Sequence, residues 1–205
     1  MRKLSVFLVF AFTITLLAFT PDGKEVKTLQ IGEQAPRIDL NLKSTKGEET
    51  MVRTMMGGKG LLVVFSCNTC PFVVAWEDRY NELYDLAKAN GIEMVLVNSN
   101  EAKRAGEDSP KEMEKHAKKL DYKAPYLIDE NSALANAWGA KTTPHVYLFD
   151  ASFRLRYEGA IDDNYKSKDE VTATYLKNAL ENLAKGEKID PANTKALGCS
   201  IKRVG

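Results

Sequence analysis

Residues 60–76, GLLVVFSCNTCPFVVAW, run from one apolar segment through two cysteines into a second apolar segment. Positions 61–65 are apolar without interruption, which is typical of a strand buried on both faces of a sheet. Pro71 suits the first turn of a helix, and Gly91 suits its C-terminal end. Between them apolar side chains recur at helical spacing, at Val73, Trp76, Tyr80 and Leu83. The stretch therefore predicts a strand-to-helix junction with Cys67 and Cys70 at its centre.

The rest of the chain alternates strands and helices around this junction. Apolar residues alternate over 38–42 as in a half-buried strand, and a short second strand is expected after the turn at 44–50. Ser109 and Glu112 form a capping box at the start of a helix. Further strands are expected at 92–98, 124–129, 145–150 and 153–159, and further helices at 110–120, 131–138 and 169–184. This order predicts an α/β fold with a sheet covered by helices on both faces.

The composition is that of an ordinary globular protein. Of 205 residues, 44% are apolar and 28% are charged, which suffices for one well-buried domain. Twenty-nine basic and 28 acidic residues leave a formal charge of +1. No electrostatic case for binding nucleic acid or an anionic membrane surface follows from this balance.

The first 20 residues predict export. Arg2 and Lys3 precede an apolar stretch at 4–19, which is typical of a secretory signal or an uncleaved membrane anchor. Residues 21–31 form an expected linker, 32–186 the main domain and 187–205 a polar C-terminal tail. The expected location is extracytoplasmic, in the periplasm or held at a membrane through residues 4–19. Outside the cytosol a close pair of cysteines can persist as a disulfide.

The predicted junction is a place where a thiol becomes reactive. Unpaired backbone N–H groups and the positive end of the helix dipole stabilise a thiolate at a helix start. A partner three residues along lies within bonding reach, so Cys67 and Cys70 can close a disulfide. We expect Cys67 to be the more exposed sulfur with the lower pKa, and Cys70 to resolve the mixed disulfide. Two buried core thiols and half of a metal site are the competing interpretations.

A second signal is KTTPHVYLFD, residues 141–150. Pro144 enters a predicted strand, where it would block a ladder hydrogen bond. A cis bond between Thr143 and Pro144 would turn the chain and expose the backbone of Thr143 to a bound peptide or thiol. Both residues are therefore candidates for the site.

With these motifs the chain resembles the thioredoxin superfamily, in which a CxxC pair faces such a proline. The segments GEQAPRIDL, LLVVFSCNTCPFV, PYLIDE, TPHVYLFD and GCSIK are similar to a peroxiredoxin-like, AhpC/TSA-related group. The resemblance implies a thioredoxin-like fold, a central mixed sheet with an N-terminal β-hairpin extension. It implies Cys67 as the nucleophile, Cys70 as its resolving partner and Pro144 as the cis-proline. With Thr143 these are the predicted site residues, and no metal or cofactor is expected.

The sequence departs from the family pattern at three points. Peroxiredoxins carry a threonine three residues before the peroxidatic cysteine, and Cys67 takes that place. No arginine can be assigned to a peroxide site. The buried aspartate of thioredoxin corresponds to Leu61. Proton transfer is therefore assigned to Glu77, to another carboxylate or to water.

Five other residues invite a functional interpretation. Cys199 lies after the last expected helix and could fold back onto Cys67, bond a second chain or remain a quiet thiol. His145 is interpreted as a strand residue with a satisfied hydrogen bond rather than a base or a ligand. His116 lies on a Lys- and Glu-rich helix and is expected to be solvated. The two tryptophans, Trp76 and Trp138, are expected to pack in the core.

The sequence predicts an exported thiol–disulfide oxidoreductase. Its expected partners are thiols and disulfides of proteins or small molecules and a redox partner that recharges the pair, with no nucleic acid among them. A thiol peroxidase on the same fold is the first alternative. A copper-carrying protein, with two thiolates and His145 as ligands, is the second. A binding module whose disulfide is only structural is the third.

Overall fold

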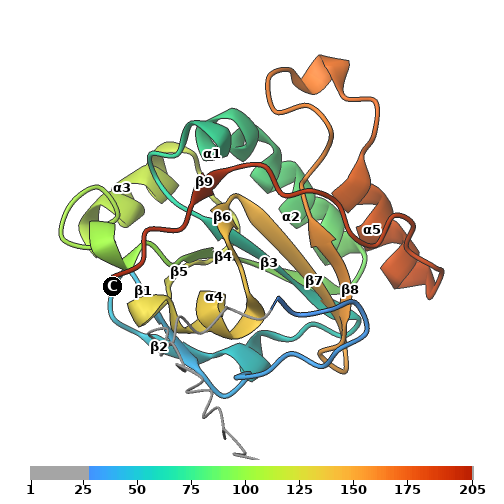
Figure 1. The fold of residues 1–205 in the computed structure, drawn as a ribbon, viewed down its shortest axis with the longest axis horizontal. Helices are drawn as coiled ribbons and strands as arrows, with labels where there is room; N and C mark the ends of the chain where they lie inside the picture. The colour runs from blue at the N-terminus through green and yellow to red at the C-terminus, as the bar shows by residue number, and fades with distance from the viewer. Residues whose placement is uncertain (1–27, 205) are drawn as a thin grey trace, which may run out of the picture.

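The computed structural model describes residues 28–204. The expected export segment at 1–20 and most of the expected linker lie outside them. Within the described residues, seven strands form one mixed sheet in the order β2-β1-β5-β4-β3-β7-β8 (Figure 1). These strands are β1 (Asn41–Ser44), β2 (Glu49–Met51), β3 (Gly60–Ser66), β4 (Ile92–Asn98), β5 (Tyr126–Ile128), β7 (His145–Asp150) and β8 (Leu155–Gly159). A separate pairing joins β6 (Thr142–Thr143) to β9 (Cys199–Ser200).

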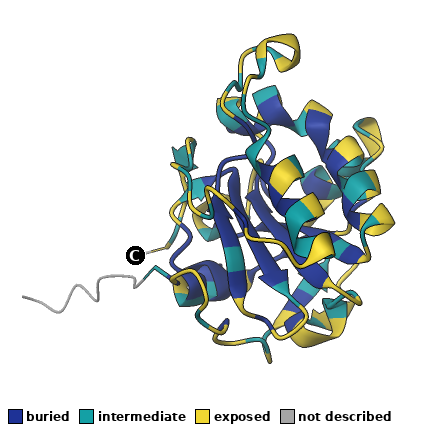
Figure 2. Ribbon diagram, turned by 90° about the vertical axis from the view of Figure 1, so that its right-hand side faces the viewer, coloured by how far each residue is buried: buried dark blue, intermediate teal, exposed yellow. Residues whose placement is uncertain are grey.

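Helices cover both faces of the sheet, as predicted. They are α1 (Pro71–Trp76), α2 (Tyr80–Ala89), α3 (Pro110–Lys119), α4 (Ala133–Trp138) and α5 (Tyr175–Lys185). Side chains of α1, α2, α3 and α5 share one core with Leu62 and Val64 of β3. Side chains of α4, with Trp138 among them, share the other core with Val63 and Phe65. Figure 2 shows the buried strands between helices whose outer sides are exposed.

The central strand β3 is buried along its whole length. It pairs in parallel with β4 and antiparallel with β7, so both of its edges are satisfied. The hairpin of β1 and β2 extends the sheet beyond β5, which confirms the expected N-terminal hairpin. No helix within residues 28–204 is long and apolar enough to cross a membrane.

The helix expected to run from Pro71 to about position 90 is divided in two. A 3-10 turn at Glu77–Arg79 separates α1 from α2. The buried guanidinium of Arg79 donates to the carbonyl of Ala75 at 2.8 Å, which takes the acceptor that a continuous helix would give to the Arg79 N–H. The other half of the guanidinium forms an ion pair with Asp162 at 3.0 Å. A contact with a distant residue therefore breaks the helix.

The two later helices test the capping signals. Ser109 accepts a hydrogen bond from the N–H of Glu112 at 3.4 Å, which confirms the predicted start of α3. The last helix begins at Tyr175 instead of near position 169. Asp163 accepts hydrogen bonds from both the backbone N–H and the hydroxyl of Thr172. These bonds hold the segment before α5 as a loop.

The segment predicted as a polar tail is packed onto the domain. In Figure 1 it runs in red from α5 across β8 to β9. Glu158 of β8 donates its N–H to the carbonyl of Ala192, and its own carbonyl accepts from the N–H of Thr194. Further along, Ile201 is buried in the core that contains Trp138. At β9 the tail thus passes beside the two cysteines at the start of α1.

Candidate active site

The cysteines of the CxxC motif lie between β3 and α1, as the sequence predicted. Cys67 directly follows β3, and Cys70 is the N-cap residue of α1 with Pro71 in the first turn. Both sulfur-bearing residues are buried and cluster with Val73 and Phe72. All three cysteines of the chain are free thiols in this structure. The pair is therefore seen in its reduced form.

The Thr143–Pro144 bond is cis, which confirms the predicted conformation. The hydroxyl of Thr143 lies 3.2 Å from Cys67 Sγ. Its carbonyl oxygen lies 3.1 Å from Cys70 Sγ, which donates to it when protonated. The structure thus brings all four predicted site residues together.

The backbone of Thr143 is not open to solvent, contrary to expectation. Thr143 is buried, and its backbone pairs with Cys199 in the β6–β9 pairing. The prediction of an exposed edge is wrong because the C-terminal tail of the same chain covers it. Only a contact between distant parts of the sequence produces this arrangement.

The two thiols ionise as one coupled unit. A hydrogen bond from the Cys67 thiol is the largest influence that lowers the pKa of Cys70 below that of an ordinary thiol; backbone N–H groups of Val73 and Cys199 add to it, and burial opposes it. The pKa of Cys67 is raised, first because its proton is shared with Cys70 and then by burial, with repulsion from the Asp108 carboxylate as a further cause. These surroundings therefore favour a thiolate on Cys70 over one on Cys67.

The sequence predicted the reverse order, with Cys67 as the exposed sulfur of lower pKa, and this is wrong. Cys67 is 2% exposed and Cys70 is 5% exposed. An ionised Cys67 would face three hydrogen-bond donors, the Cys70 thiol, the Thr143 hydroxyl and the Cys70 N–H, whereas an ionised Cys70 faces four, two thiols and two backbone N–H groups. The Thr143 carbonyl opposes ionisation of Cys70, whereas deeper burial and the Asp108 carboxylate oppose ionisation of Cys67. The prediction from sequence considered only the position of each cysteine along the helix, and so it missed the hydrogen-bond donors that Cys199 of the tail supplies to Cys70.

Alkylation of single-thiol variants tests this assignment. The double variants Cys67→Ser, Cys199→Ser and Cys67→Ala, Cys199→Ser leave Cys70 as the sole thiol of the chain. Serine still donates a hydrogen bond to the Cys70 thiolate and alanine does not. We expect the rate of iodoacetamide alkylation to reach its midpoint below about pH 8.5 with serine and at a higher pH with alanine. Equal midpoints in the two variants would contradict the assignment.

A buried carboxylate that sequence reasoning missed, Asp108, holds the loop between the cysteines. It accepts hydrogen bonds from the N–H of Asn68 at 3.0 Å and from the side-chain amides of Asn98 at 2.8 Å and Asn100 at 2.9 Å. Asn68 is the residue that follows Cys67. No sequence signal separates Asp108 from its exposed neighbour, because its role depends on donors from other segments.

Glu77, the carboxylate named from the sequence, is occupied elsewhere. It lies 2.8 Å from the imidazole of His116 and accepts a hydrogen bond from Tyr122 at 3.0 Å. His116 is therefore partly buried and paired, and the expectation of a solvated side chain is wrong. His116 lies against the 3-10 turn that follows α1. Asp108, and not Glu77, is the carboxylate that faces the cysteines.

His145 has the satisfied environment that the sequence interpretation favoured. Its Nδ1 accepts a hydrogen bond from the N–H of Lys141 at 3.3 Å, and its Nε2 lies 2.7 Å from Glu158. An Nδ1 that accepts leaves the Nε2–H to donate to the carboxylate. Both ring nitrogens are therefore used within the protein. Residues 28–204 contain no group of three or more His, Cys, Asp or Glu side chains arranged to hold a metal ion.

A cavity of about 210 Å³ opens beside the sulfurs. Cys67, Cys70, Thr143 and Asp108 line it, together with Cys199 from the tail. Its charged residues are of both signs, with Lys103 and Lys202 against two carboxylates. No arginine is among the described residues that line this cavity.

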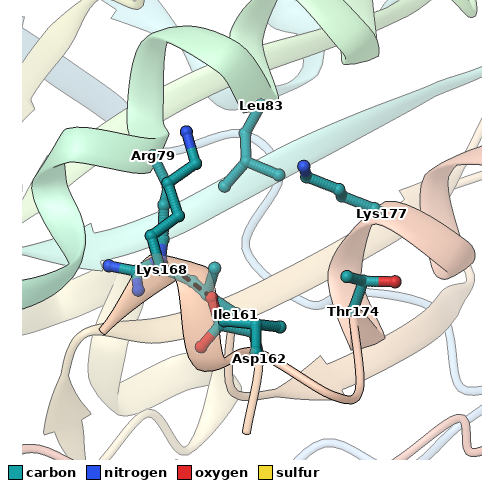
Figure 3. A pocket seen from close by; sticks show the side chains of 8 residues that line it. Arg79, Leu83, Ile161, Asp162, Lys168, Thr174 and Lys177 are labelled. Atoms are coloured by element: carbon teal, nitrogen blue, oxygen red, sulfur yellow. Dashed lines mark ion pairs between the residues drawn. The ribbon is translucent and has the colours of Figure 1, made fainter. Parts of the chain in front are cut away.

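A second cavity, of about 160 Å³, lies away from the cysteines between α2 and the segment before α5 (Figure 3). Arg79 and Asp162 form a buried ion pair in its wall. The two lysines that reach into it, Lys168 and Lys177, both pair with Glu82. Each charge has a partner within the protein, so this cavity has the character of a structural ion-pair network.

Comparisons with known proteins point to the same fold and chemistry. The sequence profile of the AhpC/TSA family matches residues 31–158. Thiol-disulfide oxidoreductase ResA of Geobacillus kaustophilus is 26% identical over 179 residues, which cover 87% of this chain and 90% of that protein.

Solved structures confirm the predicted thioredoxin-like fold. An uncharacterized conserved protein of Geobacillus kaustophilus has 32% identity and a TM-score of 0.79, over 86% of this chain and 94% of that chain. Peroxiredoxin Q of Xanthomonas campestris has the same fold at 18% identity and a TM-score of 0.55, over 78% of this chain and 98% of that chain.

Proposed function

Because the chain belongs to the AhpC/TSA family of redox enzymes, we propose that it is a thiol–disulfide oxidoreductase that cycles Cys67 and Cys70 between dithiol and disulfide. The placement of both sulfurs against Thr143, next to the cis bond to Pro144, is the observation that carries the proposal. Structural cysteines buried in apolar surroundings have raised pKa values and are inert. A buried cysteine whose pKa is lowered by hydrogen-bond donors at its sulfur instead indicates a reactive site.

The reaction begins with attack of the Cys70 thiolate on one sulfur of a substrate disulfide. The substrate S–S bond breaks, and its other sulfur leaves. Cys67 then attacks the Cys70 sulfur of the mixed disulfide, which closes the Cys67–Cys70 bond and releases the second substrate sulfur. Two electrons pass to the substrate, and the proton of Cys67 with one proton from solvent completes the two product thiols. The reverse sequence oxidises a dithiol.

Two neighbours assist the second step. The hydroxyl of Thr143 donates to the Cys67 sulfur, so it stabilises the thiolate that must form there before attack. Asp108 fixes the backbone of Asn68 and with it the loop that carries both sulfurs. Thr143 therefore contacts the reacting atoms, and Asp108 positions them.

The proposal includes the setting in which the pair works. The leader predicted at 1–20 favours an extracytoplasmic location, with residues 4–19 as a membrane tether if they are not cleaved. Cavity-lining lysines and carboxylates of both signs favour disulfides without a strong net charge. A separate redox partner must return the pair to its starting state. The name carried by the ResA relatives supports thiols and disulfides as the substrate class.

A single-turnover reaction tests the proposal. The reduced full chain is mixed with an excess of oxidised glutathione, and the reaction is stopped with acid at successive times. We expect one disulfide to be consumed per chain, faster than free cysteine reacts, and mass spectrometry to locate a Cys67–Cys70 bond. A rate no greater than that of free cysteine would overturn the proposal.

A thiol peroxidase is the second candidate, favoured by the family and by the place of Cys70 where peroxiredoxins have their reactive cysteine. We expect hydrogen peroxide to oxidise the reduced chain within about tenfold of the rate of a free thiolate, because no arginine of the described residues lines the cavity at the sulfurs. Stopped-flow tryptophan fluorescence follows the oxidation. A rate many powers of ten above that of a free thiolate would make the peroxidase the better assignment.

A further inference from the structure

The third cysteine lies against the redox pair. Cys199 packs on the cluster of Cys67, Cys70 and Val73. Its backbone N–H and its thiol both interact with the sulfur of Cys70. Of the three possibilities that the sequence left open, the structure has the tail folded back within its own chain. The sulfur that Cys199 meets is Cys70, however, and not Cys67 as the sequence suggested.

The position of Cys199 is fixed by a strand pairing. Cys199 pairs with Thr143, and Ser200 pairs with Thr142, in the antiparallel arrangement of β6 and β9. The preceding Gly198 lies so close to this edge that a Cβ atom there would be 2.3 Å from the Thr143 carbonyl oxygen. Only glycine permits such an approach, because any side chain would meet backbone atoms.

The tail is held on the far side of Cys199 as well. The N–H of Ile201 donates to the carbonyl of Lys141 at 3.0 Å, and its side chain is 5% exposed. The N–H of Lys202 donates to the side chain of Asn100 at 2.8 Å. Asn100 in turn donates to Asp108, the residue that holds the CxxC loop. The tail and the CxxC loop therefore share one hydrogen-bonded frame, with the three thiols inside it.

We propose that Cys199 is a third redox-active cysteine, which exchanges with the Cys67–Cys70 disulfide to form a Cys70–Cys199 disulfide. The inference rests on the proposed function, because it needs the Cys67–Cys70 disulfide as its starting point. The Cys199 sulfur attacks the Cys70 sulfur, the bond between Cys70 and Cys67 breaks, and a bond between Cys70 and Cys199 forms. The proton of Cys199 ends on Cys67. No external oxidant or reductant takes part.

The exchange has two consequences. Burial, and after it the contact with Cys70, raises the pKa of Cys199 to about 11, so the attacking thiolate is scarce at neutral pH and the exchange quickens as the pH rises. The new bond also joins the tail covalently to the N-cap of α1 while β9 covers the edge of Thr143. An oxidised enzyme of this kind exists in two forms, one with Cys67 free and one with Cys199 free.

Disulfide mapping of three forms of the full chain tests the proposal. Each form is reduced, oxidised with one equivalent of diamide, alkylated with iodoacetamide and digested without reductant for mass spectrometry. We expect wild type to yield both the Cys67–Cys70 and the Cys70–Cys199 peptides. The Cys67→Ser variant should yield Cys70–Cys199 within the monomer, whereas the Cys70→Ser variant should give at least tenfold less of any Cys67–Cys199 peptide.

The Gly198→Val variant displaces the tail from Thr143 while all three cysteines remain. The valine side chain would collide with the Thr143 backbone, so we expect the Cys70–Cys199 peptide to fall at least tenfold while the Cys67–Cys70 peptide remains. Far-ultraviolet circular dichroism shows that the variants are folded. If Cys67→Ser forms no Cys70–Cys199 bond while wild type still forms Cys67–Cys70, the role of Cys199 is refuted and the proposed function stands. Failure of wild type to form Cys67–Cys70 refutes both.

Discussion

Cys70→Ser is expected to lower the rate of disulfide reduction by at least about 10³-fold, because no other sulfur of the pair is held as a thiolate. Cys67→Ser combined with Cys199→Ser also prevents turnover, but for a different reason. Its Cys70 thiolate still attacks, and no other thiol of the chain is left to release the mixed disulfide. The two variants should therefore look alike in turnover and differ in what they accumulate.

The difference is measured in a Cys199→Ser background, so that the tail cannot release the intermediate. A peptide disulfide is added to each reduced variant, and the intact mass is recorded after an acid quench. We expect Cys67→Ser to carry one covalently bound peptide and Cys70→Ser to carry almost none. The opposite pattern would assign the attack to Cys67, as the position of that residue along the chain first suggested.

Removal of the Asp108 carboxylate should cause a large loss of stability. Asp108 is fully buried and accepts from three donors. With Asp108→Ala the N–H of Asn68 and the amides of Asn98 and Asn100 lose their acceptor. A buried donor left unpaired costs about 1–3 kcal/mol, so for three donors we expect a loss of at least about 3 kcal/mol in the free energy of unfolding.

Glu107 supplies the matched control. It is the neighbouring carboxylate, it is exposed, and its ion pair with Lys103 is also exposed. Glu107→Ala should change the free energy of unfolding by no more than about 0.5 kcal/mol. Urea unfolding with an unchanged slope gives both values. A loss for Asp108→Ala as small as that of the control would show that Asp108 does not hold the loop, and disulfide reduction should then be unaffected too.

Local sequence patterns are sufficient to predict the junction of β3 and α1. An unbroken apolar run and the proline that directly follows Cys70 are sufficient to place the two cysteines, because strand burial and helix initiation depend on neighbours in sequence. The cis bond before Pro144 followed from the same kind of rule and from family resemblance. The four residues chosen from the sequence are those that the structure brings together.

The structure differs from the sequence prediction where segments distant in the chain make contact. Arg79 divides the expected helix because Asp162, far along the chain, holds its guanidinium. The tail covers Thr143 because Gly198 allows backbone to approach backbone. The order of the two cysteine pKa values depends on Asp108 and on the N–H of Cys199, neither of which belongs to the CxxC motif. The periodicity and spacing of residues in the sequence do not predict these contacts, which depend on the three-dimensional fold.

The reduction potential of the Cys67–Cys70 pair tests the central claim most directly. The full chain with Cys199→Ser is equilibrated in mixtures of reduced and oxidised glutathione, and the oxidised fraction is counted by mass spectrometry after alkylation. The account predicts a reversible two-electron couple, in which a tenfold change in the ratio of the two forms takes about 30 mV, and which Cys70→Ser abolishes. An oxidised fraction that does not respond to the glutathione ratio, or that persists without Cys70, would contradict it.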